Sequence, residues 1–172
     1  ITSMLSFRDT SGRIRSLDTL CEEIDLRLVN KRVLESLIKA GAFDSLASEN
    51  GVSSPIALRS RLVAAVDRAI EHGGRRQRDR AQGQSQLFGG LEAGGTETMP
   101  LPDAAPWTEV EYLAYEKEAL GLYLSGHPMD RFANDLKACG VRTIADLTAS
   151  ATDITVGGII SAHRALTTRR GG

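Results

Sequence analysis

Residues 29–46 read VNKRVLESLIKAGAFDSL, and this stretch predicts a helix that turns sharply onto a hydrophobic core. Asn30 suits the N-terminal cap, because its side-chain oxygen can accept a hydrogen bond from a free amide of the first turn. Gly41 stands where a helix commonly ends in a left-handed conformation. Phe43 and Leu46 follow as expected core residues. The apolar residues of the helix share one face and are Val33, Leu34, Leu37 and Ile38.

A second helix is predicted to start at Ser54-Pro55, because a serine cap followed by proline suits the first helical position. Its apolar positions are Leu58, Leu62, Val63, Val66, Ala69 and Ile70. The pair Gly73-Gly74 is expected to end or loosen this helix. The arginines among the apolar residues are expected on the solvated side and are Arg59, Arg61 and Arg68. Together the two helices predict a mainly α-helical region over residues 1–74.

The composition changes after the second helix. Residues 72–106 hold seven of the 17 Gly and three of the five Pro, without a clear periodicity. We therefore expect a flexible linker over residues 75–106. The part that follows Leu91 is acidic, whereas the first part is basic and carries Arg75, Arg76, Arg78 and Arg80.

A third helix is predicted to begin at Thr108, because Thr108-Glu109-Val110-Glu111 has the form of a capping box. Its apolar positions are Val110, Leu113, Ala114, Leu120 and Leu124. Residues 116–118 are expected to form a solvated face with local ion pairs. The turn at residues 125–128 is expected to end the helix. With a short helix around Phe132 and Leu136, a helical segment is predicted over residues 107–149.

Residues 153–168 read DITVGGIISAHRALTT and change to a period near two, which is typical of a β-strand. Ile154, Val156 and Ile160 lie on one side, and Gly157-Gly158 suggest a bulge or a close backbone approach. We expect the first strand of a truncated fold over residues 150–172, unpaired because the chain offers no partner strand. This end and the start at Ile1 predict a fragment of a longer protein.

The remaining composition narrows the class of protein. The 21 Lys and Arg nearly balance the 22 Asp and Glu, so the whole chain is not a polybasic nucleic-acid binder. Cys21, Cys139 and the three His have no metal-ligand spacing, and no Gly pair matches a phosphate loop. We therefore assign no catalytic residue, no metal site and no cofactor. Short apolar runs and the lack of a signal-peptide pattern predict a cytoplasmic protein that does not enter a membrane.

Residues 82–90, QGQSQLFGG, place Leu87 and Phe88 at the centre of a polar and glycine-rich run. Either the pair packs on a helix of this chain, or it binds a partner. In the second case, the two side chains fill an apolar groove while the Gln84 amide forms hydrogen bonds beside it. Burial contributes about 2–3 kcal/mol for each side chain. Ordering of the linker opposes binding, so a micromolar contact is expected.

The pattern Gln84-x-x-Leu87-Phe88 resembles short peptides that dock on bacterial sliding clamps. The flanking stretches 29–46 and 116–130, EKEALGLYLSGHPMD, resemble the bacterial replicative DNA polymerase III alpha-subunit family. In that family they occur in this order, with an arginine-rich helical segment and the clamp-binding peptide between them. Residues 153–172 are similar to the opening strand of the family's OB domain.

The resemblance implies that residues 1–74 end a tandem helix-hairpin-helix region and that residues 150–172 start an OB-fold. It further implies a longer DNA-directed DNA polymerase that uses magnesium, whose catalytic carboxylates have no counterpart in this chain. The implied partners are the bacterial sliding clamp, duplex DNA and the other polymerase III holoenzyme subunits. Ser85 departs from stronger clamp peptides, which often carry Leu there, and this lowers the expected affinity.

Two alternatives remain open at this point. The chain could be a sequence-independent duplex-DNA-binding module in which the Leu-Phe pair is structural. Its backbone contacts are then expected from Arg75, Arg76, Arg78 and Arg80, whose charges follow one another along the chain. The second alternative is the same region of an error-prone relative of the polymerase, although the intact Gln-x-x-Leu-Phe pattern favours the replicative form.

Overall fold

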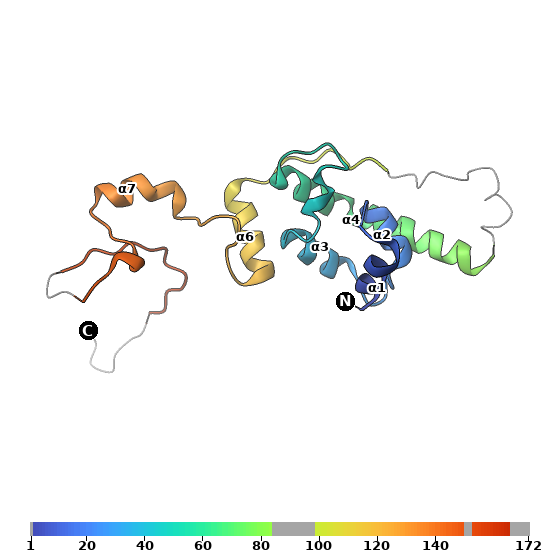
Figure 1. The fold of residues 1–172 in the computed structure, drawn as a ribbon, viewed down its shortest axis with the longest axis horizontal. Helices are drawn as coiled ribbons and strands as arrows, with labels where there is room; N and C mark the ends of the chain where they lie inside the picture. Colours follow the sequence, from blue (N-terminus) through green and yellow to red (C-terminus); the bar gives the residue numbers. More distant parts are fainter. Residues whose placement is uncertain (1, 84–98, 150–152, 166–172) are drawn as a thin grey trace. The chain divides into compact units, whose positions relative to one another are not determined.

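The computed structural model describes residues 2–83, 99–149 and 153–165. The chain divides into two compact units, Ile1–Leu124 and Ser125–Gly172. The helices of the first unit are α1 (Thr2–Ser11), α2 (Leu17–Glu23), α3 (Lys31–Lys39), α4 (Pro55–Ala81) and α6 (Glu109–Leu120), with a 3-10 helix η1 (Asp44–Ala47) between α3 and α4 (Figure 1). The described residues confirm a mainly helical fold.

The α3 helix forms as its sequence predicts. The Asn30 side chain accepts a hydrogen bond from the Val33 amide at 3.2 Å. Gly41 follows the helix with a φ of +84°, a left-handed conformation that favours glycine. The buried residues of this hairpin are Leu34, Ile38, Phe43 and Leu46, whereas Val33 is largely exposed. The buried face is therefore narrower than the one predicted.

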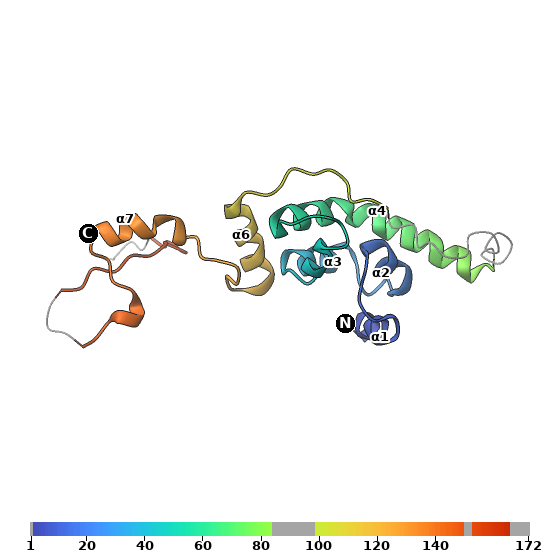
Figure 2. The same cartoon turned by 45° about the horizontal axis from the view of Figure 1, so that its top comes forward.

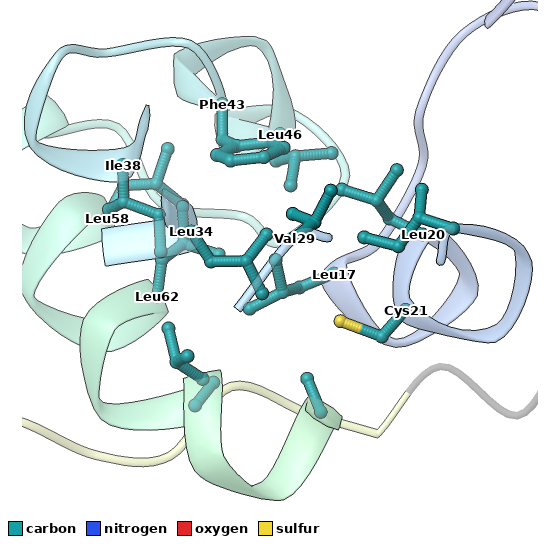
Figure 3. Close-up of a cluster of buried hydrophobic side chains, with 14 of the residues drawn as sticks. Leu17, Leu20, Cys21, Val29, Leu34, Ile38, Phe43, Leu46, Leu58 and Leu62 are labelled. Atoms are coloured by element: carbon teal, nitrogen blue, oxygen red, sulfur yellow. The ribbon is translucent and has the colours of Figure 1, made fainter. Parts of the chain in front are cut away.

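The hydrophobic core lies where α2, α3, η1 and α4 meet (Figure 3). Leu34 of α3 faces Leu58 and Leu62 of α4, and Leu20 enters from α2. Full burial of such a leucine contributes about 1.5–3 kcal/mol relative to exposure. The apolar face predicted for α4 is confirmed by this packing: Leu58, Leu62, Val66 and Ala69 are buried, and Val63 and Ile70 are partly buried.

The α4 helix is longer than its sequence predicts. Ser54 caps its start as expected. The helix does not end at Gly73-Gly74, however, and continues to Ala81. A Cβ atom at position 73 would lie 2.4 Å from the backbone oxygen of Cys21. The glycine is therefore explained by the close approach of α2 and α4, and the cost of one glycine in a helix interior is small beside that packing.

Arg59, which was predicted on the solvated side, is buried instead. Its guanidinium donates to both carboxylate oxygens of Asp44, at 2.8 and 2.6 Å, and to the Lys39 carbonyl at 3.0 Å. It also lies 3.5 Å from a Glu116 oxygen and 4.6 Å from the centre of the Tyr112 ring. Burial opposes its charge, but the hydrogen bonds to Asp44 and the neighbouring charges raise the pKa of Arg59 above its ordinary value.

Glu116 was also predicted on a solvated face, and it is fully buried. Besides facing Arg59, its carboxylate accepts a hydrogen bond from the Leu124 amide at 2.8 Å. Tyr112 and Leu113 are buried with it, and α6 lies beside α3 (Figure 2). The residues Val110, Leu120 and Leu124, which were predicted on the apolar face, are consequently exposed.

The ends of α6 differ in how well the sequence predicts them. The capping box at its start is confirmed, because the Thr108 hydroxyl accepts from the Glu111 amide and a Glu111 oxygen accepts from the Thr108 amide. Hydrogen bonds from the Thr108 amide and hydroxyl to the Glu111 carboxylate also lower the pKa of that carboxyl. The helix ends at Leu120 rather than at the turn over residues 125–128, since Gly121 adopts a left-handed φ of +80°.

Residues 99–107 return along the first half of α4 (Figure 2). Arg61 forms an ion pair with Asp103 at 3.2 Å, and Arg68 donates to the Pro100 carbonyl at 3.0 Å. Leu101 packs against the core. The two arginines are therefore not simply solvated, because they fix the segment that leads into α6.

The second unit contains the 3-10 helices η2 (Asp130–Phe132) and η3 (Ile144–Asp146) and the short helix α7 (Ala133–Ala138), as predicted around Phe132. None of its described residues is buried. The strand expected over residues 150–172 is not formed within residues 153–165. The Arg142 amide donates to the Thr155 carbonyl at 3.1 Å, but a strand requires a repeated ladder with a neighbour.

Gly157 does approach its neighbours closely, as the glycine pair suggested. A Cβ atom there would lie 2.8 Å from a methyl group of Leu136 and 3.2 Å from one of Val141. Close backbone approach, rather than a bulge in a ladder, therefore explains this glycine within the described residues.

Candidate nucleic-acid interface

The four arginines predicted to contact DNA lie on the C-terminal turns of α4 and not in a linker. Because an α-helix places residues four apart on one face, Arg76 and Arg80 both face α2, whereas Arg75 pairs within α4. Arg78 forms no ion pair with a described residue. The helix thus separates four charges that the sequence alone places in one basic run.

Glu22 of α2 lies close to three side chains of α4, which are His72, Arg76 and Arg80. Its carboxylate lies 3.6 Å from His72 Nδ1, 3.8 Å from Arg76 Nε and 4.0 Å from Arg80 Nη2. The Glu22 side chain is only 12% exposed, so it lies beneath these side chains. Glu23 adds a second carboxylate, which accepts from Arg80 Nη1 at 3.0 Å.

Acidic side chains therefore compensate much of this basic surface. Arg75 is paired with Glu71 at 3.1 Å, one helical turn away on α4. Exposed pairs of this kind contribute little to stability, but each one reduces the positive potential that a phosphate meets. The sequence analysis did not identify the acids of α2 as part of the site, because they lie more than fifty residues away from the arginines.

Gln77 and Gly73 position α2 against this half of α4. The Gln77 side-chain amide donates to the carbonyls of Cys21 and Ile24, at 2.9 and 2.8 Å. These carbonyls are at the C-terminal end of α2, where backbone acceptors lack intrahelical partners. Sequence reasoning missed α2, although Ser16 before LDTL was a usable signal, since its hydroxyl caps the helix by accepting from the Thr19 amide at 3.0 Å.

The predicted clamp-binding residues Gln84, Leu87 and Phe88 lie outside the described residues. Both ends of the connection that contains them belong to the first unit. From Arg68, which binds Pro100, to the end of α4 the helix rises by about 20 Å at 1.5 Å per residue. Residues 84–98 can span about 50 Å when extended. The connection is therefore about two and a half times as long as the path along the helix requires.

Within the described ranges, no group of three or more His, Cys, Asp or Glu side chains is placed to hold a metal ion. In the same part of the chain, no helix has the length and apolar character needed to cross a membrane.

In the first unit, α2 and α3 both pack on α4. Residues 1–51, which include α1, α2 and α3, match a family described as a helix-hairpin-helix motif.

Similarity extends over nearly the whole chain to several bacterial proteins. The DNA polymerase III subunit alpha of Vibrio cholerae is 35% identical over 175 residues, which cover 99% of this chain and 14% of that protein. The corresponding proteins of Mycobacterium leprae and Escherichia coli K12 are 37% and 34% identical over 94% and 99% of this chain. The chain belongs to the DNA polymerase III alpha-subunit family, and it spans about one-seventh of the length of these relatives.

Proposed function

We propose that this chain is the region of a replicative DNA polymerase III alpha subunit that tethers the polymerase to its sliding clamp. The observation that carries the proposal is the pattern Gln84-x-x-Leu87-Phe88, located between two stretches with family similarity. The longer protein is proposed to carry out templated nucleotidyl transfer with magnesium, through residues outside this chain.

The anchoring of both flanks supports this proposal. Upstream, α4 is fixed to α2 by Gln77, and downstream Leu101 and Asp103 hold the chain on α4. A peptide fixed at both ends to one body has less conformational freedom to lose on binding than a free peptide does. In a polymerase that also grips DNA, a micromolar clamp contact is strengthened further by effective concentration.

Titration of the chain against a bacterial sliding clamp tests the tether. The variant Leu87→Ala with Phe88→Ala is expected to weaken binding by at least a hundredfold, since each apolar side chain contributes about 2–3 kcal/mol when buried. Leu91→Ala is the matched control, because it removes the same kind of side chain outside the pattern. Equal affinity of the double variant and the parent chain would show that Leu87 and Phe88 are structural.

Duplex-DNA contact by the helical unit is the second proposed function. It is supported by the helix-hairpin-helix match over residues 1–51 and by the half-exposed arginines of α4. Such contacts follow the phosphate backbone without reading sequence, and their affinity falls steeply with salt.

Fluorescence anisotropy with a labelled duplex at 50 mM and 200 mM salt tests DNA contact. Neutralising the four arginines of α4, Arg75, Arg76, Arg78 and Arg80, is expected to reduce the salt slope by about 0.9 for each lost phosphate contact. If the parent chain shows no affinity for duplex DNA at 50 mM salt, this function is ruled out.

We further propose that residues 153–165 pair as the first strand of an OB-fold within the longer protein. Their alternating apolar residues and the close approach at Gly157 support it. We propose the replicative form rather than an error-prone relative. The sequence upstream and downstream of this chain in the full open reading frame tests that choice.

A further inference from the structure

We infer that His72, Arg76 and Arg80 form a binding row for DNA backbone phosphate, and that Glu22 and Glu23 act as its internal counter-ions. This inference rests on the proposed duplex-DNA contact. It adds which side chains of α4 meet the phosphate and what restrains them in the free chain.

The spacing of the three residues produces the row. They are four residues apart along α4, so they lie one above another on the face beside α2. Their distances to Glu22 oxygens are 3.6, 3.8 and 4.0 Å, which are longer than ordinary hydrogen bonds. His72 Nδ1 is buried and has no hydrogen-bond partner among the described residues.

The exposed sides of the two arginines leave room for a second anion. The Arg76 and Arg80 side chains are 55% and 54% exposed, while Glu22 is largely covered. Each guanidinium carries five N–H donors, and of these Arg80 uses one on Glu23. Phosphate oxygens can bind such donors in paired geometry, so a backbone phosphate and Glu23 compete for the same groups.

Charge explains the restraint. At neutral pH the two arginines contribute two positive charges, and Glu22 and Glu23 contribute two negative charges within 4.0 Å of them. The two positive and two negative charges therefore cancel within a distance shorter than the Debye length, which is about 8 Å at physiological salt. A phosphate that approaches the free chain meets a locally neutral surface. Arg75 does not belong to the row, because it pairs with Glu71 on another face.

The test compares two chains of equal net charge in duplex-DNA titrations between 50 mM and 200 mM salt. One carries Glu22→Gln with Glu23→Gln. The control carries Glu35→Gln with Glu109→Gln, on α3 and α6. Two additional phosphate contacts steepen the salt slope by about 1.8. As the salt falls from 200 mM to 50 mM, the DNA affinity of the first chain is therefore expected to rise about tenfold more than that of the control. Adding Arg76→Gln and Arg80→Gln to the Glu22→Gln, Glu23→Gln chain should abolish this gain in DNA affinity.

Each outcome decides the inference. If both chains bind DNA with the same salt slope, the counter-ion role is wrong while the proposed DNA contact stands. If neither chain binds at 50 mM salt, both are wrong. A gain that survives Arg76→Gln with Arg80→Gln shows that the phosphate binds elsewhere. If the double variant does not fold, Glu23→Gln alone replaces it, because the Glu23 side chain is 41% exposed. About half the change in salt slope is then expected.

Discussion

At the scale of single residues, Arg59 shows how a charged side chain can belong to the core. Its guanidinium joins η1 through Asp44, α3 through the Lys39 carbonyl and α6 through Glu116. Gly41 makes room for it, because a Cβ atom at that position would clash with Arg59 Nη2. The glycine is thus required both by its left-handed φ and by the arginine that passes beside it.

Substitution of Arg59 is expected to be severe. Arg59→Met leaves Asp44 and the buried Glu116 without their cation, and removal of one member of a buried pair costs about 3–5 kcal/mol. Urea denaturation, followed by the fluorescence of Trp107 beside Tyr115, measures the loss. Arg61→Met is the matched control. Its partner Asp103 is 96% exposed, so a loss of at most about 1 kcal/mol is expected. Equal losses would contradict the core role of Arg59.

Cys21 is a second residue whose chemistry depends on burial. Desolvation, with the nearby charge of Asp18, raises the pKa of its thiol to about 12. At pH 8 only about one thiol in 10⁴ is then ionised, and the thiolate is the form that reacts. We expect iodoacetamide to label the exposed Cys139 and to label Cys21 only in urea, as counted by mass spectrometry. Two labels on the folded protein at equal rates would contradict this assignment.

The same shift has a consequence for stability. The unfolded thiol, with its ordinary pKa of 9.0, loses its proton before the folded one does. The contribution of Cys21 is therefore complete below pH 9 and is lost as the pH rises toward about 12.

At the scale of elements, the contact between α2 and α4 determines where the charges of α4 lie. Gly73 allows the two helices to approach, and Gln77 binds the end of α2. As a result, Glu22 and Glu23 lie beside Arg76 and Arg80, and the last turns of α4 continue as a helix past the glycine pair.

The two adjacent glycines of α4 provide a direct test of this packing. Gly73→Ala places a methyl group 2.4 Å from the Cys21 carbonyl and is expected to destabilise the protein by about 1–3 kcal/mol. At Gly74 the nearest atom is 3.7 Å away, so Gly74→Ala is expected to stabilise the helix by up to about 1 kcal/mol. Thermal unfolding followed by circular dichroism distinguishes the two. Stabilisation by both substitutions would contradict the close approach at Gly73 and would show that both glycines only weaken the helix.

At the scale of the whole molecule, the first unit is assembled from segments on both sides of residues 84–98. α6 docks through Glu116, Tyr112 and Leu113, and the preceding segment docks through Leu101. The residues that make these contacts lie outside the connection of residues 84–98.

Cleavage of that connection is therefore expected to leave the unit intact. Residues 91–97 can be replaced by a protease recognition sequence of equal length, and after cutting the two pieces should co-elute in size-exclusion chromatography. With Arg59→Met the pieces should separate, because the buried ion pair with α6 is lost. Separation of the pieces without that substitution would show that the docking of α6 depends on the connection.

Much of this architecture follows from local sequence. The caps at Asn30, Ser54 and Thr108 act within one helical turn, so the residues themselves predict where α3, α4 and α6 begin. The apolar period of α4 likewise identifies its buried face. The family similarity was also visible in residues 29–46 and 116–130, and the comparisons confirm it.

Other features were decided only by the tertiary structure, because they depend on partners far away in sequence. From the sequence, Arg59 and Glu116 were predicted to be solvated, but in the fold they are buried, where Arg59 pairs with both Asp44 and Glu116. Gly73 was predicted to end or loosen the helix, but it allows Cys21 of α2 to pack against α4. The basic run that follows Gly73 lies on a helix, and Glu22 of α2 neutralises part of its charge. The sequence by itself determined where α3, α4 and α6 start and which apolar residues α4 buries, since these depend on neighbours a few residues apart. Which charges are buried, and which pair between helices, was decided by tertiary contacts, since such a charge is stabilised by the group that the fold places beside it.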